Sequence, residues 1–224
     1  MRSSQSLLLV LVALGVGVLS YFYLTNQSPT DDVEKAAVPV QQTQEPVAQS
    51  ETTTQQNTSR PSLEISVGGE ANGTIVIELF NDVAPQHVER IKALAASGAY
   101  DGVVFHRVID GFMAQTGDVQ FGKSDGEMAR AGQGGSDMPD LEAEFSDKTF
   151  ARGVVGMARS SDPNSANSQF FIMFAPAPHL DGQYTIVGQV TSGLDILDTI
   201  KMGQGNSGTV TGEPDVMKSV VVSE

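Results

Sequence analysis

The stretch from Phe105 to Asp118 carries a cation, an amide and two large apolar side chains within a few residues. If it runs as a strand, a tight turn and a second strand, its side chains alternate between two faces. Arg107, Met113 and Gln115 then share one surface, whereas His106 points away from Arg107 and is interpreted as structural. A guanidinium and an amide beside an apolar pocket suit a small apolar ring that bears a carbonyl. This description fits a prolyl residue in a peptide.

Residues 157–172 form a second stretch whose side chains could contribute to a functional site. It reads Met-Ala-Arg-Ser-Ser-Asp-Pro-Asn-Ser-Ala-Asn-Ser-Gln-Phe-Phe-Ile. An apolar strand enters, a loop of small polar residues follows, and a second strand leaves. Alternation places Gln169 and Phe171 on one face of the second strand, with Phe170 and Ile172 on the other. One phenylalanine can therefore serve the core while the other lines a groove.

The spacing of apolar residues predicts many short strands and two separated helices. Alternation predicts strands at 62–67, 73–80, 103–108, 112–115, 154–158, 169–174, 184–190 and 217–222. Helical spacing predicts one helix that begins at Pro85 and stops by Gly98, and a second over residues 194–202. The glycine-rich stretch 122–140 is predicted to be a loop. This pattern favours a mainly β fold, a closed antiparallel β-barrel capped by two helices.

The composition limits the possible functions. The chain has a formal charge of −14, and residues 62–224 contain 10 basic and 22 acidic side chains, so the acidity belongs to this region. We expect no nucleic-acid partner, because phosphate recognition needs a patch of lysine or arginine. The absence of cysteine excludes disulfides, thiolate chemistry and cysteine-zinc sites. The histidines, His87, His106 and His179, show no metal-ligand spacing, so no metal or other cofactor is expected.

Residues 1–24 have the composition of a membrane or secretion signal. Arg2 precedes an almost wholly apolar run from Leu7 to Leu24, which approaches the thickness of a bilayer's hydrocarbon core. The segment is either a signal anchor or a cleaved signal peptide. Acidic residues follow it, which predicts an extracytoplasmic location, membrane-anchored or, after cleavage, periplasmic or secreted. Residues 25–61, rich in Gln, Thr, Ser and Pro, are predicted to be a flexible linker to a folded domain at 62–224.

Together with an Asp-Gly turn within residues 178–184, these stretches resemble the cyclophilin family of peptidyl-prolyl cis-trans isomerases over nearly all of residues 63–222. The resemblance implies that Arg107 is catalytic, together with Phe112 and with Gln115 at the substrate carbonyl. It implies a proline pocket formed by Phe112, Met113, Phe171 and Leu180. The other substrate-binding residues that it implies are Ala158, Arg159, Ser160, Gln169, His179 and Tyr184.

The chain departs from the best-known cyclophilins at several positions and resembles bacterial members of the family there. It has His179 where they have tryptophan, Tyr184 where they have histidine, and Arg159 where they often have asparagine. Because the tryptophan serves cyclosporin binding in the family, tight binding of that inhibitor is not implied. The resemblance implies a monomeric enzyme that acts on exposed X-Pro bonds of proline-containing polypeptides. With an extracytoplasmic location, this predicts assistance to the folding of exported proteins.

Three other functions compete with this one. A groove of this kind can hold proline-containing segments as a binding module or chaperone, without faster isomerisation. Residues 203–208 match the G-x-G-x-x-G pattern of dinucleotide-binding enzymes, but they follow a predicted helix instead of a strand. Residues 122–126 match the Gly-x-Ser-x-Gly pattern of serine hydrolases, but they lie in a charged, glycine-rich loop. Neither pattern has the structural context that its chemistry needs.

Overall fold

The computed structural model describes residues 60–126 and 128–224. The predicted signal segment 1–24 and the linker up to residue 59 lie outside the described residues. The described part contains one nine-stranded sheet with the order β3-β9-β1-β2-β8-β6-β7-β5-β4, and its paired strands are antiparallel. Its strands are β1 (Ser62–Gly68), β2 (Gly73–Leu79), β3 (Val103–Val104), β4 (Arg107–Ile109), β5 (Met113–Thr116), β6 (Val154–Met157), β7 (Phe170–Met173), β8 (Ile186–Ser192) and β9 (Val216–Ser223).

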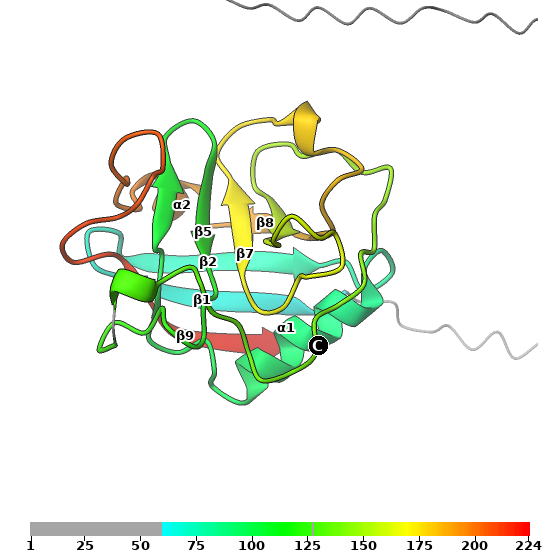
Figure 1. Ribbon diagram of the computed structural model, residues 1–224, viewed down its shortest axis with the longest axis horizontal. Helices are drawn as coiled ribbons and strands as arrows, with labels where there is room; N and C mark the ends of the chain where they lie inside the picture. Colours follow the sequence, from blue (N-terminus) through cyan, green and yellow to red (C-terminus); the bar gives the residue numbers. More distant parts are fainter. Residues whose placement is uncertain (1–59, 127) are drawn as a thin grey trace, which may run out of the picture. The chain divides into compact units, whose positions relative to one another are not determined.

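The sheet curls, so that strands at its two halves run in different directions. In Figure 1, β1, β2 and β9 run side by side, and β5 and β7 run across them. The predicted mainly β class is confirmed. Strands β3 and β4 form the two ends of the sheet order, and no ladder joins them among the described residues. Closure of the sheet into a barrel therefore stays a prediction.

Two α-helices accompany the sheet, α1 (Pro85–Ala96) and α2 (Leu194–Asp198), with two short 3-10 turns, η1 (Met128–Arg130) and η2 (Pro178–Leu180). Pro85 begins α1, because the first turn of a helix does not need the N–H that proline lacks. The helix ends before Gly98, whose φ of +69° favours a residue without a Cβ. Helix α1 packs against β9, and α2 packs against β2.

The predicted strand 103–108 is wrong in one respect, because it is two strands. Strand β3 pairs with β9, and the N–H of Phe105 still donates to the carbonyl of Asp215 at 2.9 Å. After His106 the chain pairs with β5 instead, as strand β4. The break lies where the chain exchanges one neighbouring strand for another, and the sequence of a single segment does not show which strands it pairs with.

The second helix and strand β8 also differ from their predicted bounds. The helix predicted over 194–202 ends at Asp198, because the N–H groups of Thr199 and Ile200 bond three residues back and that of Lys201 bonds to a carboxylate oxygen of Asp215. The strand predicted at 184–190 begins only at Ile186 and continues to Ser192. Competition from a buried side-chain acceptor thus shortens the helix.

Apolar side chains on opposite faces of the sheet form two buried clusters. The larger cluster contains Phe170 and Ile172, whereas the smaller one contains Phe171 and Met173. The predicted alternation along this strand is confirmed. Within residues 60–126 and 128–224, no helix combines the length and apolar character needed to cross a membrane.

Candidate active site

A row of four residues crosses strands β4, β5, β7 and β6. Arg107 lies opposite Gln115, Gln115 opposite Phe171, and Phe171 opposite Gly156. Because directly opposed residues project from the same face of a sheet, the row brings a guanidinium, an amide and an aromatic ring together. The predicted common surface of Arg107, Met113 and Gln115 is confirmed, since all three line one cavity.

This cavity, which we call the apolar pocket, has a volume of about 200 Å³. Met113, Phe171 and Leu180 are buried and supply apolar wall, while two arginines and an amide supply polar groups. Its volume suits one small ring more than a drug-sized ligand. The lining residues, all of them in the set expected from the sequence, are Arg107, Phe112, Met113, Gln115, Ala158, Arg159, Phe171, Leu180 and Tyr184.

The Arg107 guanidinium is held at two of its nitrogens. Nη1 donates to Oε1 of Gln115 at 3.2 Å and lies 3.8 Å from Sδ of Met113, and Nε donates to the carbonyl of Ser207 at 2.9 Å. Among the described residues, Nη2 has no acceptor. Burial lowers the pKa of Arg107, and Tyr184 acts in the opposite direction, but a guanidinium stays protonated in proteins. Arg107 thus keeps a permanent charge and an unengaged nitrogen at the pocket.

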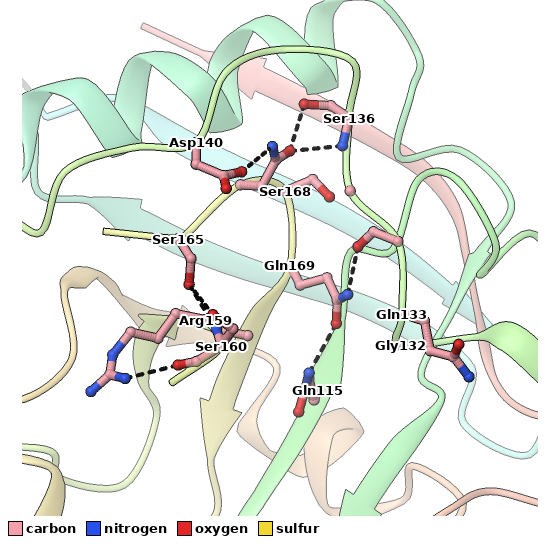
Figure 2. A pocket seen from close by; sticks show the side chains of 14 residues that line it. Gln115, Gly132, Gln133, Ser136, Asp140, Arg159, Ser160, Ser165, Ser168 and Gln169 are labelled. Carbon is pink, nitrogen blue, oxygen red and sulfur yellow. Dashed lines mark hydrogen bonds between the residues drawn. The ribbon is translucent and has the colours of Figure 1, made fainter. Parts of the chain in front are cut away.

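A chain of amide hydrogen bonds continues from Gln115 (Figure 2). Nε2 of Gln115 donates to Oε1 of Gln169 at 2.9 Å, and Nε2 of Gln169 donates to the carbonyl of Gly134 at 2.7 Å. Each amide thereby accepts on its oxygen and donates from its nitrogen. The direction of every bond follows from Arg107, which can only donate.

The far end of this chain is anchored by a buried carboxylate. Asp118 is fully buried. One of its oxygens accepts the N–H groups of Gln120 and Phe121, and the other accepts those of Gly132 and Gly134. Asp118 therefore fixes the main chain that receives Gln169.

The opposite wall of the apolar pocket depends on a glycine. A Cβ at Gly156 would lie 2.6 Å from Cζ of Phe171 and 2.7 Å from Cε1 of Phe150, so only glycine lets the two rings stack there. Tyr184 meets Phe171 edge to face at 5.8 Å between ring centroids. The guanidinium of Arg159 lies 4.4 Å from the Tyr184 centroid, which closes this wall with a cation-π contact.

A second, polar cavity of about 370 Å³ shares Gln115, Ala158 and Arg159 with the apolar pocket. Figure 2 shows residues that line this polar cavity. Ser160 and Gln169, both expected at the site, line only this polar cavity. Its outer wall was not predicted. The side-chain oxygen of Asn167 accepts from the N–H and hydroxyl of Ser136, and its nitrogen donates to Asp140 and to the carbonyl of Met138. The small polar residues of the 160–168 loop were the available signal.

His179 is exposed at the surface, whereas His106 is buried. His179, expected to bind substrate, is exposed and does not line either cavity, but its ring stacks on Phe112 with centroids 5.8 Å apart. His106 is buried and packs against Gly132, and its orientation away from Arg107 stays a prediction. Burial lowers the pKa of His106.

The competing sequence patterns lack the context for their chemistry. Residues 203–208 follow helix α2 and lie along strand β4, and no helix begins after them. Ser124 lies in a turn, without the strand-to-helix elbow of a hydrolase nucleophile. In the described part of the chain, no group of three or more metal-ligating side chains is close enough to hold a metal ion.

The chain is similar to known proteins of one family. Residues 62–222 match the family model described as cyclophilin type peptidyl-prolyl cis-trans isomerase/CLD. A probable peptidyl-prolyl cis-trans isomerase of Brucella suis is 55% identical over 156 residues, which cover 68% of this chain and 80% of that protein. Peptidyl-prolyl cis-trans isomerase CYP18-1 of Arabidopsis thaliana is 44% identical over 136 residues, covering 61% of this chain and 81% of the relative.

A solved structure shares the fold. It is the crystal structure of a cyclophilin type peptidyl-prolyl cis-trans isomerase from Cryptosporidium parvum, determined in the presence of the dipeptide Ala-Pro. Its TM-score is 0.62 at 28% sequence identity, and the match covers 73% of this chain and 99% of that one. The chain therefore belongs to the cyclophilin family of peptidyl-prolyl cis-trans isomerases.

Proposed function

We propose that Arg107 is the catalytic group of this isomerase and that the apolar pocket holds the prolyl ring of the substrate. The observation that carries this proposal is the position of the guanidinium at the pocket wall, with Nη1 and Nε engaged by the protein and Nη2 without an acceptor among the described residues. The charge of Arg107 is permanent, so the reaction requires no proton transfer from the enzyme.

The barrier to rotation of a peptide C–N bond, about 18–20 kcal/mol, comes from amide resonance. When the bond is twisted by about a quarter turn, resonance is lost, and the prolyl nitrogen becomes pyramidal with an available lone pair. A guanidinium N–H directed at that nitrogen is attracted more strongly in the twisted state than in either planar isomer. Only such a difference between transition state and ground state accelerates a reaction.

The other pocket residues position the substrate for this contact. Phe112, Met113, Phe171 and Leu180 hold the prolyl ring, so that the carbonyl side of the bond rotates. The amide nitrogen of Gln115 carries two N–H groups, one of which is engaged with Gln169. The second N–H is then available to the substrate carbonyl. Fixed groups in a partly desolvated pocket need no reorganisation during the reaction.

We propose proline-containing polypeptides as substrates. The Cryptosporidium parvum relative was crystallised in the presence of Ala-Pro, which supports this class of ligand. Ala158 and Arg159 line both cavities, and Ser160 and Gln169 line the polar one. In this arrangement the residues that precede proline extend over Ala158 toward the polar cavity, with His179 and Tyr184 at the edge of the apolar pocket.

The test is the variant Arg107→Ala, assayed with a protease-coupled proline peptide and by NMR exchange spectroscopy. Turnover should fall by about 100-fold or more, as for loss of a fixed transition-state donor. Arg152→Ala is the matched control, because Arg152 is also half-buried but bonds to Asp198 and lies outside both cavities. Near wild-type turnover by folded Arg107→Ala protein would overturn the role of Arg107.

We further propose that the enzyme acts outside the cytoplasm on exported proteins. Support comes from the apolar run at 7–24, preceded by Arg2 and followed by acidic residues. Cell fractionation with N-terminal sequencing tests this location. Membrane-bound protein with an intact N-terminus is the result expected of a signal anchor, and a new N-terminus near Tyr21 is that expected of a cleaved signal. Recovery in the cytoplasm would contradict both.

A further inference from the structure

The glycine-rich segment 203–208 covers the edge of strand β4 that does not pair with β5. The N–H of Gly203 donates to the carbonyl of Val108 at 2.9 Å, and the N–H of Val108 donates to the carbonyl of Gly208 at 2.7 Å. Just beyond the segment, the N–H of Val210 donates to the carbonyl of His106 at 3.0 Å. The segment is thus bonded to the main chain on both sides of Arg107.

The same segment also holds the Arg107 side chain. The carbonyl of Ser207 accepts Nε at 2.9 Å, while Gln115 accepts Nη1 at 3.2 Å. Because a guanidinium is planar and rigid, hydrogen bonds that fix Nε and Nη1 also fix the position of Nη2. One anchor alone would leave the group free to rotate about the remaining hydrogen bond.

We propose that residues 203–208 are a positioning loop for Arg107, which sets the direction in which Nη2 meets the prolyl nitrogen. This inference rests on the catalytic role proposed for Arg107. It gives a function to the G-x-G-x-x-G pattern, which binds no dinucleotide in this proposal. The loop acts through Arg107 and does not itself touch the substrate.

Glycine at position 208 makes the close approach of the loop possible. Gly208 has a φ of +69°, and a Cβ there would overlap Cγ1 of Ile109 and lie 3.0 Å from the carbonyl oxygen of Val108. Gly205 has a similar φ of +60°, but a Cβ there would have no neighbour within 4 Å. Alanine at either position meets the same backbone strain. Only alanine at 208 pushes the loop away from β4.

The experiment compares Gly208→Ala with Gly205→Ala in the full chain. We expect Gly208→Ala to lower kcat by about tenfold, the effect of one lost hydrogen bond in the transition state, with KM for a proline peptide changed by less than about twofold. Gly205→Ala should keep both constants within about twofold of wild type. The Arg107 Nε–H resonance, assigned by its absence in Arg107→Lys, should exchange slowly with solvent in wild type and Gly205→Ala, and rapidly in Gly208→Ala.

The outcomes separate this inference from the function on which it rests. If Arg107→Ala is inactive but Gly208→Ala matches Gly205→Ala in kcat and in Nε–H exchange, the positioning role is wrong and the catalytic role stands. If Arg107→Ala is active, both are wrong. Should Gly208→Ala fail to fold, one glycine inserted after Gly205 displaces the Ser207 carbonyl without a clash. The same loss of kcat is then expected, and an unchanged kcat overturns the proposal.

Discussion

Arg107 of β4 and Gln115 of β5 lie directly opposite one another, and Nη1 of the arginine donates to Oε1 of the amide at 3.2 Å. The pair stands at the centre of a longer set of hydrogen bonds. On one side it continues through Gln169 to the carbonyl of Gly134, and on the other it reaches the carbonyl of Ser207. The orientation of the arginine therefore depends on two loops that are far apart in the chain.

Gln169→Ala should lower kcat/KM without unfolding the domain. The change leaves Gln115 without its acceptor, so the amide that holds Nη1 of Arg107 is free to rotate. A loss of about three- to tenfold is expected from one hydrogen bond, measured in the protease-coupled assay. Gln189→Ala is the control, because Gln189 is also half-buried and bonds to a carbonyl, that of Arg152. Equal activity of the two variants would refute the amide chain.

Gly156→Ala should raise KM for a proline peptide by a larger factor than it lowers kcat, when kcat is calculated per folded molecule. The new Cβ would meet the rings of Phe171 and Phe150, and Phe171 lines the apolar pocket, so a displaced ring alters the pocket. Overpacking of this kind destabilises a protein by about 1–3 kcal/mol. Gly188→Ala provides the comparison, since its Cβ would meet Ile77 and the main chain of Glu78, away from both cavities. Urea unfolding should show similar losses for both variants, and peptide titration should show weaker binding only for Gly156→Ala.

Acidification should weaken the packing of the 139–150 segment on helix α1. Burial raises the pKa of Glu144, but hydrogen bonds from the His87 ring and from the N–H groups of His87 and Gln86 outweigh it and leave the pKa lowered. For His87, burial lowers the pKa more than Glu144 raises it. In both cases the unfolded chain takes up the proton first, so stability is present at neutral pH and is lost as pH falls.

Glu144→Gln tests this pH dependence. At pH 7 the variant should be less stable by about 1–2 kcal/mol, the contribution of charge-assisted hydrogen bonds at a helix N-terminus. The difference from wild type should shrink as pH falls through the lowered pKa of Glu144, because a protonated carboxyl resembles the amide. Thermal unfolding between pH 7 and 3 measures it, with exposed Glu142→Gln as control. A difference that does not vary with pH would contradict the assignment.

Asp118→Asn should loosen the loop that ends the amide chain. An amide has one acceptor oxygen, so two of the four N–H groups that Asp118 binds lose their partner. A destabilisation of about 2–4 kcal/mol is expected for buried donors left unsatisfied. Amide hydrogen exchange should quicken at Gly132 and Gly134. The exposed Asp140→Asn should change neither stability nor exchange at these two glycines.

The sequence predicted the local arrangement of the site well. Alternation along strands is a property of the backbone, so the common face of Arg107, Met113 and Gln115 followed from spacing alone. The same reasoning separated Phe171 from Phe170, which lie in different apolar clusters. The division of residues 103–108 between β3 and β4 could not be predicted, because it depends on the partner strands, β9 for the first half and β5 for the second.

By itself, the sequence determined which side chains could form the pocket, their faces on each strand, and the resemblance that assigns the family. Only the tertiary structure decided the register that sets Gln115 beside Phe171, and with it the row across four strands. It alone revealed the carbonyls of Gly134 and Ser207 as anchors. The reason is physical: main-chain carbonyls are present in every residue, so no residue type marks them, and their position depends on how distant loops pack.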